Sequence, residues 1–259
     1  MTEWIVTHVP AGLVLVIFIV GIAGGSMLLQ SVVRKRFPAL TRDEHNDVTR
    51  FTYGVIGFVY AFFMGFVVST MWGQINTADG KARTEGAAAV QMANDLRVFD
   101  QPDADRIRAA LLTYEQAALA EWEVQQRGAS ARADTALADL YVAYEQVQPG
   151  TDVQTRFLNT SFTNLDKVSQ ARTERLLQAR TDTGPPWPLW AVIFITSAMV
   201  LGTAIIYGVE KATMHYPMTA VIGALVATNL FLVVQLSHPF LGDLSTSSEP
   251  LREVIAVLQ

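Results

Sequence analysis

The segment from Phe51 to Ile75 constrains the fold most, because it is long and carries no charged residue. A charge-free run of this length can cross the roughly 30 Å hydrocarbon core of a bilayer as a helix. Residues four apart lie on one face of a helix, so the segment carries two neighbouring stripes. The small stripe consists of Gly57, Ala61, Gly65 and Ser69. The aromatic stripe consists of Phe58, Phe62 and Phe66, with Gly54 one turn earlier.

Each stripe predicts a different contact. Small side chains let membrane helices approach closely, so the small stripe predicts burial against a neighbouring helix. In a symmetric oligomer the aromatic stripe would point rings of Phe at the central axis, where an apolar constriction can gate an ion pathway by dewetting. Spacing alone favours the simpler interpretation, in which these Phe side chains face lipid or another helix.

The composition indicates a membrane protein. The chain has 259 residues, of which 51% are apolar, and this fraction is high for a soluble domain with this many charges. The absence of cysteine excludes disulfides and thiolate metal sites. The net charge of −5 is mild and indicates no nucleic-acid partner. Four runs are long enough to span a bilayer, at residues 11–29, 51–72, 189–207 and 218–236.

We therefore predict an all-α protein with four spans and a helical extramembrane domain between spans two and three. The expected parts are spans one and two with a basic loop at 1–75, the helical domain at 76–184, spans three and four at 185–240, and a C-terminal tail at 241–259. The helical domain is rich in Ala, Gln, Glu and Arg, which favour helices. We expect the second span to continue as one helix through the Ala-rich stretch near Ala87.

Three apolar stripes at steps of three and four residues predict packed helices in this domain. The first is Ile107, Leu111, Tyr114, Ala118 and Trp122; the second is Leu137, Leu140, Tyr141, Tyr144 and Val147; the third is Leu158, Phe162, Leu165 and Val168. If the first stripe were exposed, it would suit a partner protein.

The membrane orientation follows from basic residues, and two counts compete. The loop after span one contains Arg34, Lys35, Arg36, Arg42 and Arg50. The positive-inside rule then places this loop in the cytoplasm and residues 76–184 outside. An equal set lies near the membrane ends of the long domain, at Lys81, Arg83, Arg172, Arg175 and Arg180.

Residues with catalytic or metal-binding chemistry are scarce. The four histidines fall in separate segments, and no pair has metal-ligand spacing. Glu174 beside Arg175, and Lys81 with Glu85, are interpreted as surface charges. Gly21, Gly24 and Gly25 predict a close packing surface within span one, and Asn229 in span four predicts an interhelical hydrogen bond or a pore-lining group. We expect no enzyme activity, metal or cofactor.

The second span resembles a known family. The run from Phe58 to Gln74 is similar to the second helix of bestrophins, where a Phe-Val-x-x-Phe start leads to Val-Val, then Trp, then Gln. The resemblance implies that Phe58 and Phe62 occupy neck positions of a pore. The third neck position falls on Gly54, where this chain lacks a large apolar side chain.

The segment after span four carries a second match. Its motif consists of His238, Pro239, Phe240, Gly242 and Asp243. It is similar to the bestrophin segment that ends in Pro-Phe and a nearby Gly. In animal members an acidic run follows and clasps calcium, whereas here only Asp243 is acidic, so no calcium site is expected.

With these matches, the chain as a whole resembles the bestrophin-like family of actinobacterial membrane proteins. The resemblance implies a multi-pass protein of the bacterial plasma membrane that forms a homo-oligomer, a pentamer as in bestrophins, and passes a permeant anion. Bestrophins place their helical part in the cytosol, which opposes the charge count after span one. A non-conducting scaffold or sensor with a protein partner is the alternative, and an intramembrane enzyme is a weaker one.

Overall fold

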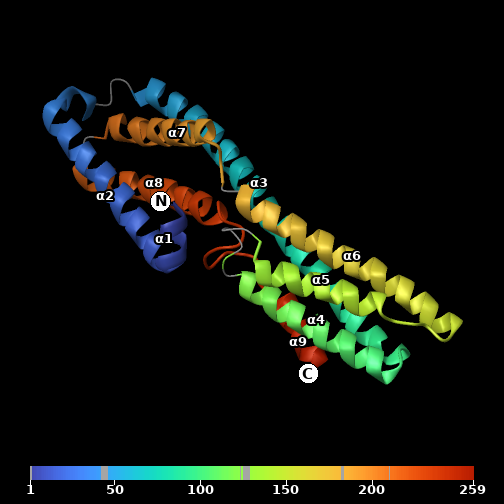
Figure 1. Cartoon of the computed structure of the whole chain (residues 1–259). Coiled ribbons are helices and arrows are strands. Elements are labelled where there is room, and N and C mark those ends of the chain that lie inside the picture. The colour runs from blue at the N-terminus through green and yellow to red at the C-terminus, as the bar shows by residue number, and fades with distance from the viewer. Residues whose placement is uncertain (1, 42–45, 123, 125–128, 182–183, 210) are drawn as a thin grey trace. The chain divides into compact units, whose positions relative to one another are not determined.

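The computed structural model describes residues 2–41, 46–122, 124, 129–181, 184–209 and 211–259 (Figure 1). The regular structure of these residues is entirely helical, which confirms the predicted all-α class. The chain divides into two compact units. The membrane unit comprises Met1–Gly73 and Gly184–Ser245, and the polar unit comprises Gln74–Thr183 and Thr246–Gln259. The long helix α3, Asn46–Asp95, contributes residues to both.

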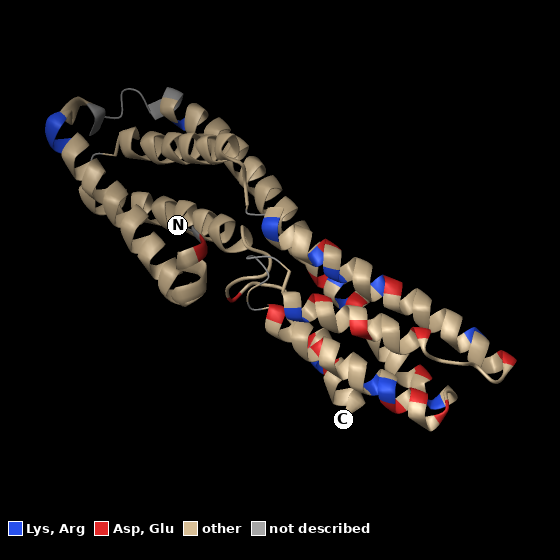
Figure 2. Ribbon diagram, viewed as in Figure 1, with Lys and Arg blue, Asp and Glu red and all other residues tan. Residues whose placement is uncertain are grey.

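The membrane unit contains the predicted spanning helices. It includes α1 (Thr2–His8), α2 (Ala11–Arg36), the short 3-10 helix η1 (Pro38–Thr41), the first part of α3, α7 (Trp187–Ile206) and α8 (Ala212–Leu236). In length and apolar composition, α2, α3, α7 and α8 can each cross a membrane, and these four candidate spans correspond to the four predicted ones. Figure 2 shows that charged residues are scarce along the parts of these helices that belong to the membrane unit, apart from the basic end of α2, whereas the part of α3 in the polar unit carries several.

Small residues bring α2 and α8 together. A Cβ atom at Gly223 of α8 would lie only 2.7 Å from the Cα atom of Ala23 and 2.9 Å from the Ser26 hydroxyl on α2. Only glycine allows this approach, as is usual where membrane helices associate closely. Among the described residues no atom lies within 4 Å of a Cβ built at Gly21, Gly24 or Gly25, so the packing surface expected there is not formed within one chain and stays a prediction for an assembly. The close contact lies on the adjacent face of α2, at Ala23 and Ser26.

The polar unit is a bundle of amphipathic helices. It consists of the rest of α3, the 3-10 helix η3 (Leu96–Val98), α4 (Gln101–Trp122), α5 (Ala131–Glu145), α6 (Asp152–Thr181) and α9 (Glu249–Leu258). Steps of three and four residues place the core side chains on one face of each helix. The first predicted stripe is entirely buried, from Ile107 to Trp122, and Leu140, Tyr144, Leu165 and Val168 are buried with it. Because that stripe forms the core, it is not the exposed partner surface that a scaffold would need.

The helix α3 runs unbroken for 50 residues, as the Ala-rich stretch near Ala87 predicted. In the polar unit, α9 packs against α4, and its Leu251, Val254 and Leu258 are buried. Its Pro250 approaches α3 at Gly86. A Cβ at Gly86 would lie 2.6 Å from the Pro250 carbonyl oxygen. Any larger residue at this position would therefore push α9 away from α3. The segment 241–259, expected only as a tail, thus contains a helix that was not predicted.

Candidate pore helix and flanking motifs

The aromatic stripe lies on the outer face of α3 in the membrane unit. The exposed fractions of Phe58, Phe62 and Phe66 are 73%, 72% and 67%. The inner face of the same helix consists of Tyr60, Met64, Val67 and Met71, which are buried. Gly54 also lies on the outer face. The fold of one chain therefore does not use these three phenyl rings, which remain available to lipid, to another copy or to a pore.

The small stripe lies beside the aromatic one and is also uncovered. Ala61, Gly65 and Ser69 are exposed, and Gly57 is half-buried. Within the described chain, no atom lies within 4 Å of a Cβ built at Gly57 or Gly65. No helix of the same chain packs closely there, so burial of this stripe stays a prediction that requires a second molecule.

The motif after α8 contacts the N-terminal segment of the membrane unit. His238, Pro239 and Phe240 are buried. Gly242 has a φ angle of +82°, which favours glycine, and a Cβ there would lie 2.5 Å from the Val6 side chain. The Asp243 carboxylate accepts a hydrogen bond of 3.0 Å from the Ala11 backbone N–H, the first residue of α2. A carboxylate stabilises a helix N-terminus by accepting from free N–H groups and by opposing the helix dipole.

The matches at α3 and after α8 extend across the sequence. Residues 20–251 match the profile of the Bestrophin-like domain. The chain belongs to the bestrophin-like family. No curated protein gives a significant match to the sequence.

Solved structures share the fold of this bestrophin-like protein. A crystal structure of a bacterial bestrophin homologue from Klebsiella pneumoniae, phased with zinc, aligns with a TM-score of 0.69 at 14% identity. The alignment covers 94% of this chain and 97% of the homologue. Two single-substitution variants of the Klebsiella protein align with TM-scores of 0.72 and 0.71, at 13% and 12% identity. They cover 93% and 96% of this chain, and 97% and 98% of their own.

The polar unit contains a buried ionic cluster that the sequence pattern did not predict. The Arg175 guanidinium donates to both carboxylate oxygens of Glu85 on α3, at 3.0 and 3.2 Å. Arg172 donates to both oxygens of Glu121 on α4, at 2.9 and 2.7 Å, and to Asp134 on α5 at 2.8 Å. Except for Asp134, these side chains are almost entirely buried. The cluster therefore ties α6 to three other helices.

The carboxylates keep Arg175 charged inside the bundle. Burial alone favours its neutral form, but Glu85 and Glu121 hold the pKa of Arg175 above its usual value. Trp122 adds a further contact, since its ring centre lies 4.9 Å from the guanidinium carbon. Removing either Glu85 or Arg175 would leave the other charge buried and uncompensated, so this ion pair is sensitive to substitution.

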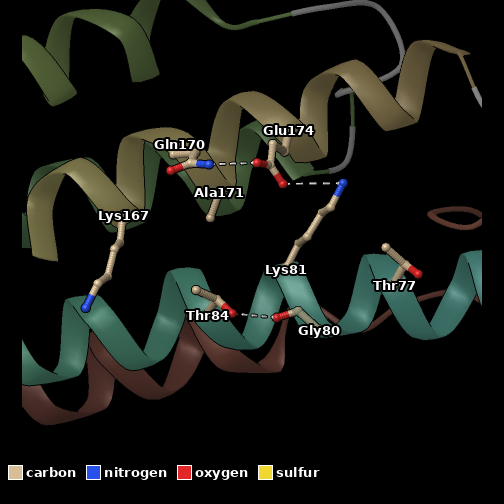
Figure 3. Close-up of a pocket in the computed structure, with 8 residues that line it drawn as sticks. All are labelled: Thr77, Gly80, Lys81, Thr84, Lys167, Gln170, Ala171 and Glu174. Carbon is tan, nitrogen blue, oxygen red and sulfur yellow. Dashed lines mark hydrogen bonds and ion pairs between the residues drawn. The ribbon is translucent and has the colours of Figure 1, made fainter.

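Glu85 and Arg175 are thus not the surface charges that we expected. Lys81 pairs instead with Glu174 at 3.5 Å, across α3 and α6 (Figure 3). The missed signal is spacing. Glu85 continues the buried series Ala78, Ala82, Ala89 and Met92 of α3, and Arg175 continues the series Leu165, Val168, Arg172 and Ala179 of α6.

A hollow of about 420 Å³ lies between α3 and α6 beside this pair (Figure 3). Its polar side chains are largely paired with one another. Gln170 donates to Glu174, the Thr84 hydroxyl donates to the Gly80 carbonyl, and Lys167 lies 3.4 Å from the Asn164 side-chain oxygen just outside the hollow. The described residues contain no group of His, Asp and Glu side chains placed to hold a metal ion.

Asn229 forms a hydrogen bond within its own helix. Its side-chain amide donates a 3.1 Å hydrogen bond to the Leu225 carbonyl one turn earlier on α8. Among the described residues, this bond within α8 is the one that the Asn229 side chain forms. An interhelical hydrogen bond to another copy, or a pore-lining role, stays a prediction.

Proposed function

We propose that this bestrophin-like protein is a multi-pass, homo-oligomeric ion channel of the bacterial plasma membrane. In the proposed assembly, copies of α3 surround a central axis, and a pentamer is the expected stoichiometry. Phe58 and Phe62 form the narrowest apolar ring, with Gly54 and Phe66 one turn to either side. Membership of the bestrophin-like family supports a channel.

One observation carries the proposal: α3 leaves two adjacent stripes uncovered on a charge-free span. If this helix contacts a second copy through its small stripe, the neighbouring aromatic face can lie close to the shared axis. Helical spacing puts Phe58 and Phe62 about 100° from the small stripe. One contact surface and one pore surface therefore fit on the same helix.

We propose anions as the permeant ions. The ring carries no fixed charge, so selectivity has to come from desolvation and from local dipoles. The edge of a phenyl ring is its electropositive part. Rings that present their edges to the axis would favour a partly dehydrated anion over a cation.

The experiment is planar-bilayer recording of the double variant Phe58→Ala/Phe62→Ala. If the phenyl ring limits conduction by dewetting, removing it should raise the current at least several-fold at equal protein density. Phe194→Ala is the matched control, because Phe194 is an exposed aromatic residue of α7 away from the stripe. An assembled double variant that passes neither anions nor cations would refute the channel.

A further inference from the structure

Glu115 of α4 is a buried carboxyl group that neither the fold nor the proposed pore uses. Its side chain is fully buried. Neither carboxyl oxygen has a hydrogen-bond partner among the described residues. A buried polar group without a partner is costly, and a buried charge without a partner is far more costly.

The guanidinium groups of Arg172 and Arg175 already bind other carboxylates. Arg175 bonds both oxygens of Glu85, and Arg172 bonds both oxygens of Glu121 and one of Asp134. The Tyr114 hydroxyl also donates to Glu85, at 3.1 Å. The cluster thus holds more carboxyl groups than guanidinium groups, and Glu115 is the one left without a cation.

The cluster beside Glu115 draws its charged and titratable groups from four helices, and of these Glu85 and Arg175 act on Glu115 electrostatically. Glu85 lies on α3, Tyr114 and Glu121 on α4, Asp134 on α5, and Arg172 and Arg175 on α6. The helix α9 packs through apolar residues, and its Glu249, Arg252 and Glu253 are exposed. None of these groups supplies the positive charge that an ionised Glu115 would need.

We propose that Glu115 is a proton-binding site of the polar unit, and that its proton keeps the Glu85–Arg175 tie between α3 and α6 intact. With the proton bound, Glu85 and Glu121 are the ionised carboxylates beside Arg175, at 3.0 and 3.7 Å. Once the proton leaves, Glu85 and Glu115 both carry negative charge near one guanidinium, and the bundle must loosen or admit a counter-ion. This proposal does not depend on ion conduction.

The direction of the pH effect follows from the electrostatics. Burial raises the pKa of the Glu115 carboxyl well above its usual value, and the charge of Glu85 raises it further against a lowering by Arg175. The folded chain then holds the proton more tightly than the unfolded chain. The stabilisation that this proton contributes to the fold is fully present below the usual carboxyl pKa. It is lost as the pH rises from there to the folded-state pKa.

The decisive measurement is the infrared spectrum of the full-length protein in detergent at neutral pH. The wild-type minus Glu115→Gln difference should contain the carbonyl band of a protonated carboxylic acid. The matched control is Glu145→Gln, which removes an exposed carboxylate of α5 and should remove only a carboxylate band. Glu115→Met, which is of similar volume, replaces Glu115→Gln if that variant does not fold.

Thermal unfolding provides the second readout. The wild-type midpoint should fall by several degrees relative to Glu115→Gln as the pH rises from the usual carboxyl pKa to the raised folded-state pKa. A difference spectrum with only a carboxylate band would show that Glu115 is ionised and would overturn the proposal. Parallel pH dependences of the wild type and Glu115→Gln would overturn it as well. Neither result would bear on whether the protein conducts ions.

Discussion

Replacing Arg175 by methionine is expected to destabilise the polar unit by about 3–5 kcal/mol. Methionine keeps most of the side-chain volume but leaves Glu85 buried without its guanidinium partner. A loss of this size should lower the thermal midpoint by roughly 6–20 °C. Circular dichroism of the purified chain in detergent measures the change.

Two further variants separate charge from packing. Arg180→Met removes an exposed arginine from the same helix and should leave the midpoint nearly unchanged. Adding Glu85→Gln to Arg175→Met should recover part of the loss, because the orphaned charge is then gone. If Arg175→Met and Arg180→Met both have the thermal midpoint of the wild type, the buried Glu85–Arg175 ion pair does not stabilise the fold.

The second large effect is expected at Gly65. Replacing it by leucine should abolish the oligomer while the single chain stays folded, because no atom of the described chain lies within 4 Å of a Cβ at Gly65. The added side chain would hold two α3 helices apart where the small stripe has to pack. Light scattering combined with size-exclusion chromatography measures the mass of the assembly.

Gly12→Leu is the matched control for this effect. Gly12 is exposed on α2, and a Cβ there also has no described atom within 4 Å. This variant should assemble as the wild type does. A Gly65→Leu oligomer of wild-type mass would place the subunit interface elsewhere on the membrane unit.

Periodicity predicted much of the fold. The unbroken α3 and the buried stripe from Ile107 to Trp122 follow from the spacing of apolar and small residues, which the structure confirms. Periodicity failed at Glu85 and Arg175 because hydropathy assigns charged residues to the surface. Their positions in the three-and-four spacing of α3 and α6 would have placed them inside.

Other features depend on contacts that no local pattern encodes. The Asp243 carboxylate caps α2 at Ala11, a residue at the other end of the chain. The packing of α9 on α3 depends on Gly86 meeting Pro250. The role of the small stripe depends on a second molecule, so neither the sequence nor one chain determines it.

Cysteine accessibility at Phe58 tests the central claim most directly. The chain contains no cysteine, so Phe58→Cys introduces a single thiol. The control is Phe194→Cys on α7, where an exposed aromatic residue would face lipid. We predict that a charged, water-soluble thiol reagent reacts with Phe58→Cys and blocks its current, while Phe194→Cys keeps its current. If Phe58→Cys reacts no faster than Phe194→Cys, or reacts without a change in current, the α3 stripe does not line an aqueous pore.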